Sequence, residues 1–213
     1  MAALTRGQLI EQILRQVYGG YVSEDSSITP MLVNQYINQG IGVAAKANYT
    51  DNLKLDGVSY VNGAFYTTFK GIVPVKDETN LWKIQLPQVP VGIGNSEGIS
   101  ILAFKDSKNN VSFPCIPISE NQKTYFQMMR PIPNKTIYYS NGDLIYILST
   151  VTLSNYTASV TMISGGDSTD LTSTINVPAD YIPTIIQYVQ QQLLLQKNAP
   201  KDLANDGQDL AVN

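Results

Sequence analysis

Residues 178–197 read PADYIPTIIQYVQQQLLLQK and predict a long amphipathic helix. The residues Ile182, Ile185, Ile186, Val189, Leu193 and Gln196 recur at the spacing of one helical face. We expect Asp180 to cap this helix, and Pro183 fits the first turn, where a missing N–H does no harm. The opposite face carries amides rather than charges: Gln187, Gln190, Gln191 and Gln192. A helix that only covers a core usually shows water a charged face, so this amide face is a candidate subunit contact.

The same preference for amides over charges runs through the whole chain of 213 residues. Charged residues make up 15%, against about 25% in an average soluble domain. The sequence has 17 Asn and 15 Gln, and its 13 Tyr outnumber its 5 Phe. Low charge with many tyrosines is typical of a surface that another protein covers. A low-charge soluble protein from an Asn-rich genome would show the same composition, and both interpretations stay open here.

The net charge of −3 argues against some functions. A sequence-independent nucleic-acid binder needs clustered Lys and Arg to neutralise phosphates, and no basic run occurs. Residues 1–10 lack the pattern of a signal peptide, and no apolar run reaches the roughly 18 residues that a membrane span needs. We therefore expect no membrane contact and a cytoplasm-like site of synthesis and use.

Two further helices are predicted at the N-terminus. Thr5 and Gln8 match a capping box, and Gly19-Gly20 ends the first helix, whose buried stripe is Leu9, Ile10, Ile13, Leu14 and Val17. Thr29 caps the second helix with Pro30 at its first position, and its inner face is Val33, Ile37, Ile41 and Ala44. The small residues Gly40, Gly42, Ala44, Ala45 and Ala47 favour packing against the first helix over a contact with another subunit.

The pattern changes from helical to extended at about residue 56. Asn62-Gly63 predicts a hairpin between 58–61 and 64–75, and 140–143 predicts another between 136–139 and 144–148. Further strands are predicted at 81–86, 99–104, 111–118 and 156–163. Ser119 and Gln122 match the capping box of a short helix at 119–129. Residues 164–176 are expected to form a flexible polar loop.

The predicted fold is α+β, with the N-terminal helix pair and the C-terminal helix packed together around one core. A large, mainly antiparallel β-rich region fills the middle of the chain. The expected parts are an N-terminal helical part at 1–55, the β-rich region at 56–176, the C-terminal helix at 177–197 and an extended tail at 198–213. The tail has no hydrophobic periodicity, so we expect it to become ordered only on binding a partner.

No residue set in the sequence predicts catalysis, a metal site or a cofactor. Cys115 lies in an apolar run and the chain has no His, so a buried thiol is favoured over a nucleophile. Paired carboxylates occur only in predicted turns or the tail, where pKa values are rarely shifted. Asp167, Ser168 and Asp170 could bind calcium but lack the EF-hand pattern, which favours a solvated loop. We therefore expect no enzyme.

Aromatic side chains on the predicted strands leave a second function open. Tyr60, Phe65, Tyr66, Phe69, Tyr138, Tyr139 and Tyr146 could form a platform for sugars or bases. Such residues are more often the core and the cross-strand pairs of a sheet. The alternative function is therefore a carbohydrate-binding or adhesin-like β module.

Four segments together resemble a known family: LTRGQLIEQILRQVYGG, ITPMLVNQYINQGIGVAAK, WKIQLPQVPV and VPADYIPTIIQYVQQQLLLQKNAPKD. In this order they resemble a head-to-tail connector or ring protein of crAss-like bacteriophages. In outline the chain is also similar to the adaptor proteins of short-tailed phages. Those have N-terminal helices, a β-rich insertion and a C-terminal helix whose end reaches toward the portal. The family has no catalytic motif.

The resemblance implies a virion protein at the head–tail junction, made in the cytoplasm of the host bacterium. It would form a ring, of about twelve copies, that binds the portal protein and other ring or tail proteins. Twelve copies of net charge −3 would carry −36, so DNA would pass through the lumen without sequence-specific contact. The expected partner-binding residues are Gln187, Gln190, Gln191, Lys197, Asn198, Pro200, Lys201, Asp202 and Leu203.

Overall fold

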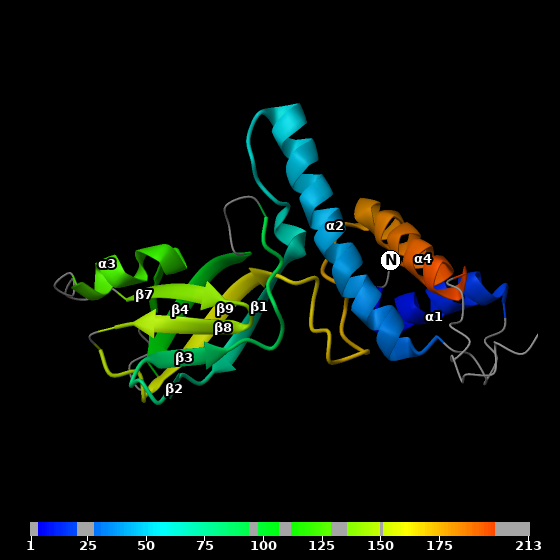
Figure 1. Ribbon diagram of the computed structural model, residues 1–213. Coiled ribbons are helices and arrows are strands. Elements are labelled where there is room, and N and C mark those ends of the chain that lie inside the picture. Colours follow the sequence, from blue (N-terminus) through cyan, green and yellow to red (C-terminus); the bar gives the residue numbers. More distant parts are fainter. Residues whose placement is uncertain are drawn as a thin grey trace, which may run out of the picture.

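Helices stand at both ends of the chain and strands fill its middle, so the fold is α+β as predicted (Figure 1). The computed structural model describes residues 4–20, 28–93, 98–106, 112–128, 136–149 and 151–198. One side of the molecule is a layer of three helices, and the other side is a pair of packed sheets (Figure 1).

Capping side chains set the starts of the two N-terminal helices, and left-handed glycines set their ends. Helix α1 (Arg6–Tyr18) begins with the predicted capping box, in which Thr5 and Gln8 each bond the other's backbone N–H. Gly19 ends it in the left-handed conformation, at φ 71°. Helix α2 (Pro30–Asp56) begins after Thr29, whose side chain accepts the N–H of Leu32, and ends at Gly57. The predicted caps of both helices are confirmed.

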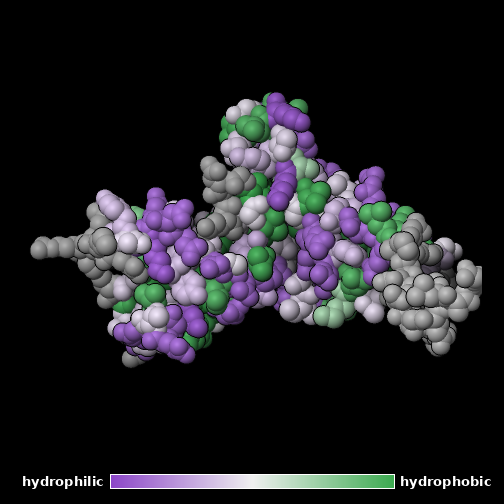
Figure 2. Space-filling model, in the orientation of Figure 1, coloured by the Kyte–Doolittle hydropathy of each residue, from purple (hydrophilic) through white to green (hydrophobic). Residues whose placement is uncertain are grey.

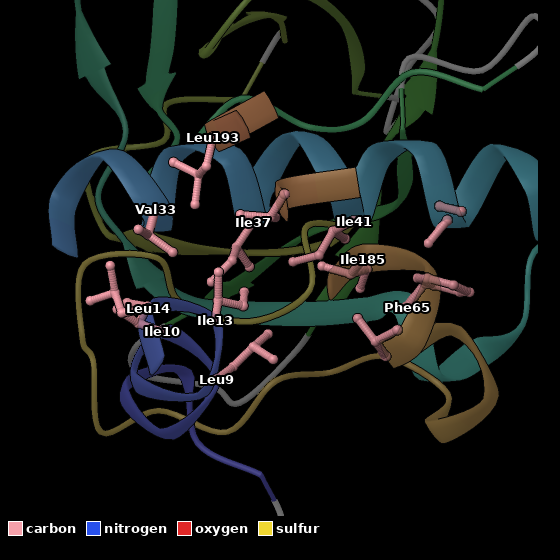
Figure 3. Close-up of a cluster of buried hydrophobic side chains, with 14 of the residues drawn as sticks. Leu9, Ile10, Ile13, Leu14, Val33, Ile37, Ile41, Phe65, Ile185 and Leu193 are labelled. Carbon is pink, nitrogen blue, oxygen red and sulfur yellow. The ribbon is translucent and has the colours of Figure 1, made fainter. Parts of the chain in front are cut away.

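Helix α4 (Ile182–Asn198) closes the layer that α1 and α2 begin. Ile185, Val189 and Leu193 are fully buried and project from one face of α4. They meet the buried stripes of α1 and α2, in which Leu9, Ile13, Val33, Ile37 and Ile41 are also fully buried (Figure 3). The expected packing of the C-terminal helix against the N-terminal pair is confirmed. The predicted cap is wrong, because Asp180 lies inside a short 3-10 helix (η3, Ala179–Tyr181) that precedes α4.

Among the small residues of α2, Gly40 faces α4, whereas Gly42 faces Val91. A Cβ added to Gly40 would lie 3.1 Å from Ile185 Cγ2 and 3.3 Å from the Tyr188 ring. Ala44 and Ala45 are fully buried in the same core. The contact is therefore within the chain, as predicted, but the expected partner helix is wrong: Gly40 allows α2 and α4 to approach closely.

Nine strands in the described ranges form two sheets. The first has the order β1-β9-β4-β5 and the second β2-β3-β8-β7-β6, with β6 and β7 parallel and the other pairs antiparallel. Their bounds are β1 Tyr66–Ile72, β2 Val75–Lys76, β3 Trp82–Gln85, β4 Ile99–Asp106, β5 Ser112–Pro114, β6 Ile116–Pro117, β7 Ile137–Asn141, β8 Leu144–Leu148 and β9 Tyr156–Ile163. Short helices lie at Gly63–Phe65 (η1), Glu120–Gln122 (η2) and Lys123–Met128 (α3).

The two sheets pack face to face through alternating side chains. Ile145 and Ile147 of β8 are buried on one sheet, and Ala158, Val160 and Met162 of β9 on the other. The next residue of β9, Ile163, belongs instead to the core of the three helices. Strand β9 thus contributes to both hydrophobic cores and joins them.

Three predicted strands are wrong in detail. The one at 64–75 is divided among η1, β1 and β2. Residues 58–61 form no strand, because the backbone N–H of Asn62 bonds Asn48 Oδ1 of α2 (2.8 Å) and Asn62 itself caps η1. The predicted strand 111–118 is divided at Cys115 between the two sheets: β5 pairs with β4, and β6 pairs with β7. The strands predicted at 81–86, 99–104 and 156–163, the hairpin of β7 and β8, and the capping box at Ser119 are confirmed.

The connection from β9 to α4 is not the flexible loop that its composition predicts. Backbone N–H groups of Arg6 and Gly7 donate to the carbonyls of Ser173 and Leu171, and Ile175 N–H donates to Leu4 O. Thr5 and Thr174 form an isolated bridge. The segment is therefore bonded along the start of α1. No helix in the described ranges combines the length and apolar character that crossing a membrane requires.

Candidate assembly interface

The amide face of α4 is divided between solvent and a contact inside the chain. Gln187 and Gln191 are exposed. Gln190 is half-buried, and its Nε2 donates to Gln16 Oε1 of α1 over 2.7 Å. The orientation follows from the buried stripe of Ile185 and Val189, which turns the amides away from the core. Two of the three predicted glutamines thus remain open to a partner, and their role stays a prediction.

The last turns of α4 add an apolar surface that the sequence reasoning did not include. Leu194 is 47% exposed and Leu195 is 66% exposed. Lys197 and Asn198 are the last two residues of the helix. The other predicted contact residues, Pro200, Lys201, Asp202 and Leu203, lie outside the described residues. Their part in partner binding stays a prediction.

An open hollow of about 360 Å³ lies on the outer face of α1. Among the described residues it is lined by Gln8, Glu11, Gln12, Arg15 and Gln16. Arg15 and Glu11 form an ion pair one turn apart, and both side chains are about 60% exposed, at 63% and 60%. Gln16 connects this surface to α4 through its bond with Gln190. The outer face of α1 thus combines three glutamines with one exposed ion pair.

A buried arginine, Arg6, holds the connection from β9 to α4 against α1 and α2. Arg6 is fully buried, and its Nη1 donates to Asn34 Oδ1 (2.8 Å) and Asn38 Oδ1 (2.7 Å) of α2. Its Nη2 donates to the Gly165 carbonyl at 3.5 Å. Burial lowers the pKa of Arg6, and the charge of Asp167 opposes that change. Asn34 Nδ2 adds a bond to Ser168 O (2.9 Å), so one cluster ties α1, α2 and the connection together.

Sequence reasoning missed this cluster, although two signals mark it. A cation in the first turn of a helix opposes the helix dipole, so Arg6 needs other partners. Asn34 and Asn38 are one turn apart and directly follow the buried Val33 and Ile37. Amides at that spacing beside a buried stripe indicate a polar contact at the edge of the core.

The far end of α2 also escaped prediction. Leu53, Leu55, Val58 and Tyr60 are 46%, 82%, 59% and 47% exposed, and they lie at the apex where α2 turns back toward β1 (Figure 1). We call these four residues the α2 tip. Figure 2 shows hydrophobic side chains at the same apex. Leu53 and Leu55 are two residues apart, the spacing of a strand face rather than of a helix face, and that spacing at the end of a helical segment is the signal in the sequence.

The reactive side chains of the sequence are engaged in local structure. Cys115 is buried, which raises the pKa of its thiol to about 12 and keeps it protonated at neutral pH. Asp77 accepts bonds from Thr79 and from the backbone N–H of Leu81. These bonds lower the pKa of Asp77 and hold the turn in which it lies. Within the described residues, no three His, Cys, Asp or Glu side chains gather as a metal site would require.

The aromatic residues do not form the binding platform of the alternative function. Phe65 is fully buried, while Tyr138 and Tyr139 are each only 2% exposed. Tyr139 stacks on Tyr146 across the β7–β8 pair, with centroids 5.1 Å apart. Phe65 packs edge-on against Tyr181 at the helix layer. Phe65, Tyr138, Tyr139 and Tyr146 thus serve the cores and a cross-strand pair, while Tyr60 is exposed at the α2 tip.

Comparison with known proteins adds one match that covers nearly the whole chain. The sequence model of a protein family described as "Phage tail ring protein 2" matches residues 8–210. None of the curated proteins searched matches the chain. The matched range begins in the first turn of α1 and includes the rest of the described helices and both sheets.

Proposed function

Because the chain belongs to the crAss-like phage family described as phage tail ring protein 2, we propose that it forms the ring that joins the portal to the tail at the head–tail junction. Membership makes the chain a structural ring protein of a phage tail and a component of the virion. A role of this kind is non-enzymatic. It also implies contacts with other copies of the chain and with other tail proteins.

The observation that carries the proposed position is the return of α4 to the N-terminal helices. The order of two helices, a β-rich insertion and a closing C-terminal helix is that of the short-tailed phage adaptors that the sequence resembles. In those proteins the end of the last helix reaches the portal. Here α4 lies against α1 and α2, and the sequence continues beyond Asn198 for 15 residues. We propose that residues 199–213 reach the portal or the next ring.

The proposed ring has about twelve copies and surrounds the DNA channel. At a net charge of −3 per chain, twelve copies carry −36. Since DNA phosphates are negative, a lumen of that charge repels the duplex and lets it slide during packaging and ejection. The low content of Lys and Arg thus supports passage of DNA without binding.

The test combines assembly and partner binding. The purified chain is examined by native mass spectrometry and negative-stain imaging, alone and with portal rings and tail proteins of the same phage. We expect closed rings, either alone or on the portal, and co-sedimentation of the chain with portal rings. Duplex DNA should not be retained by the rings at physiological salt.

Failure to bind the portal or any neighbouring tail protein would contradict the proposed position. Rings that assemble only on a tail protein remote from the portal would keep the family role but move the ring along the tail. Tight, salt-sensitive DNA binding would contradict the proposal that DNA passes through the ring without being bound.

A further inference from the structure

The α2 tip exposes more apolar surface than its position requires. Leu55 is 82% exposed although it lies within the last turn of a helix that could present polar residues there. Polar neighbours surround it, namely Asp51, Lys54 and Asp56. An apolar centre with a charged rim is the usual composition of a contact between proteins.

Hydrogen bonds hold the α2 tip in one shape. Asn52 Nδ2 donates to the carbonyl of Tyr60 (3.0 Å), and the Tyr60 hydroxyl donates to Asp56 Oδ2 (2.9 Å). Asn48 is 6% exposed, and its Oδ1 accepts from Asn52 Nδ2 (3.2 Å) and from the N–H of Asn62 (2.8 Å). A surface fixed in advance loses less conformational entropy when it binds. The amides of α2 therefore prepare an exposed apolar surface for a contact.

The segment that leads into α4 contacts α2 at Asp51 through Tyr181 of η3. The hydroxyl of Tyr181, just before α4, donates to Asp51 Oδ2 over 3.0 Å, and Asn48 Nδ2 donates to the same hydroxyl. Beyond Asp51 the last turn of α2 projects past the start of α4 (Figure 1). In the described part of the chain no helix lies beside this last turn (Figure 1).

A second apolar surface lies at the opposite end of the same helix layer. Helices α2 and α4 are antiparallel, because Gly40 meets Ile185 while Tyr36 bonds Gln196. The start of α2 and the end of α4 are therefore neighbours. Met31 is 84% exposed there, together with Leu194 and Leu195. We call Met31, Leu194 and Leu195 the α4 end; at 1.5 Å per residue, Met31 and Leu55 are about 36 Å apart along α2.

We propose that the α2 tip of one copy docks against the α4 end of the next copy in the ring. This inference rests on the proposed ring, because a closed ring of identical chains needs two different surfaces that fit each other. The chain offers apolar surfaces at both ends of its longest helix, about 36 Å apart. A head-to-tail contact requires two different surfaces that are separated on the subunit. A two-fold contact, in which one surface meets itself, requires no such separation.

The experiment uses three double variants of the full chain. The tip variant is Leu55→Asp with Val58→Asp, and the end variant is Met31→Asp with Leu195→Asp. The matched control, Val73→Asp with Val89→Asp, changes two valines of 61% and 62% exposure outside the helices. Ring formation is measured by native mass spectrometry over a concentration series, alone and with the portal and tail proteins. Circular dichroism melting checks that each variant is folded.

We expect the tip variant and the end variant each to need at least about tenfold more protein to assemble, since a charge at the centre of an interface costs that much or more. The control should assemble like the wild type. Mixing the tip and end variants should give a dimer that grows no further. The end variant keeps an intact tip, the tip variant keeps an intact end, and only that one contact can form.

The outcomes separate this inference from the proposed function. If the wild type forms rings and the tip variant forms rings of equal stability, the inference is overturned and the proposed function stands. A mixture without dimers would overturn the pairing of these two surfaces. A wild-type chain that stays monomeric in every mixture would contradict the function, and the inference with it. If an aspartate variant melts below the wild type, Leu55→Ser with Val58→Ser repeats the measurement with a smaller change.

Discussion

Arg6 is the residue on which the contact between the helix layer and the β9–α4 connection depends. Its guanidinium spans two amides of α2 and one carbonyl of the connection, a geometry that only the planar fork of arginine provides. It is fully buried, yet the nearest opposite charge, Asp167, lies in the connection itself. Loss of Arg6 would leave Asn34 and Asn38 without their partner at the edge of the core.

We predict that Arg6→Ala lowers the free energy of unfolding by about 3 kcal/mol, because two charge-assisted bonds are lost from a buried site. Arg6→Lys should recover only part of this, since an ammonium cannot span the three acceptors. The measurement is urea denaturation. Arg15→Ala is the control, and it should change stability by less than about 0.5 kcal/mol because its ion pair is exposed. Equal effects of Arg6→Ala and Arg15→Ala would contradict the role of Arg6.

Asp167 makes stability depend on pH in the acid range. The hydroxyl and the N–H of Thr169 bond its carboxylate, and with the charge of Arg6 they hold its pKa below the ordinary value. A lowered folded-state pKa stabilises the fold above the unfolded pKa of about 3.9, and this is lost as pH falls through the folded pKa.

Asp167→Asn should therefore destabilise the chain at pH 7, by less than about 1 kcal/mol because solvent screens the site. It should make less difference at pH 2, because more of the wild-type carboxyl is protonated there. Urea denaturation at both pH values measures this, with exposed Glu78→Gln as control. A difference between Asp167→Asn and the wild type that is the same at both pH values would refute the prediction.

At the scale of elements, the β9–α4 connection packs so closely on α2 that one position accepts only glycine. Gly165 has φ +66°, and a Cβ there would lie 2.5 Å from Ile41 Cδ1 and 2.8 Å from Ile41 Cγ2. Ile41 is itself fully buried and cannot move aside freely. The carbonyl of Gly165 also accepts bonds from Arg6 and from Asn176 N–H.

Gly165→Ala is predicted to lower the free energy of unfolding by about 3 kcal/mol or more, from backbone strain together with overpacking. Gly142→Ala is the matched control, with φ +64° in the β7–β8 turn and open space around it. It should cost roughly 1 kcal/mol from strain alone. If thermal or urea unfolding shows that Gly165→Ala and Gly142→Ala lose similar amounts of stability, the close packing on Ile41 contributes nothing.

The local elements of this fold are predictable because their signals lie within a few residues. The capping boxes at Thr5 and Ser119, the Thr29-Pro30 start of α2 and the β7–β8 hairpin all depend on side chains next to the backbone groups that they bond. The three buried helical stripes follow from periodicity in the same way. The caps and the hairpin were predicted with the correct residues, whereas Val17, Ile182 and Ile186 of the predicted stripes are only partly buried and Gln196 is exposed.

The errors come from partners distant in the sequence. Asn62-Gly63 has the composition of a hairpin turn, but Asn48 of α2 bonds Asn62 and the chain turns into η1 instead. The polar connection 164–176 looks flexible by composition, but α1 supplies its backbone partners. The sequence correctly predicted that the glutamines of α4 lie on the side opposite its buried stripe. That Gln190 bonds Gln16 depends on how α1 and α4 pack, which no local pattern contains.

For the whole molecule, the β-rich region and the helix layer share strand β9, and the described core closes at α4 before residue 199. Deletion of 199–213 should therefore leave the free energy of unfolding unchanged within about 0.5 kcal/mol. The same deletion should weaken binding to the portal or the adjacent ring protein, if the tail makes that contact. Denaturation curves and co-sedimentation measure the two effects. A truncated chain that unfolds would contradict this division of roles.

The closure of the first core by the last helix also sets an order of events during synthesis. Helices α1 and α2 leave the ribosome about 140 residues before α4 is complete, which takes roughly 7 to 30 s at 5–20 residues per second. During that interval the sheets can form their own core, while the stripes of α1 and α2 lie open to water or a chaperone. The α4 end is among the last surfaces to be made. Under the proposed pairing, a nascent chain thus lacks a finished α4 end, and only a completed subunit can make both contacts of a ring.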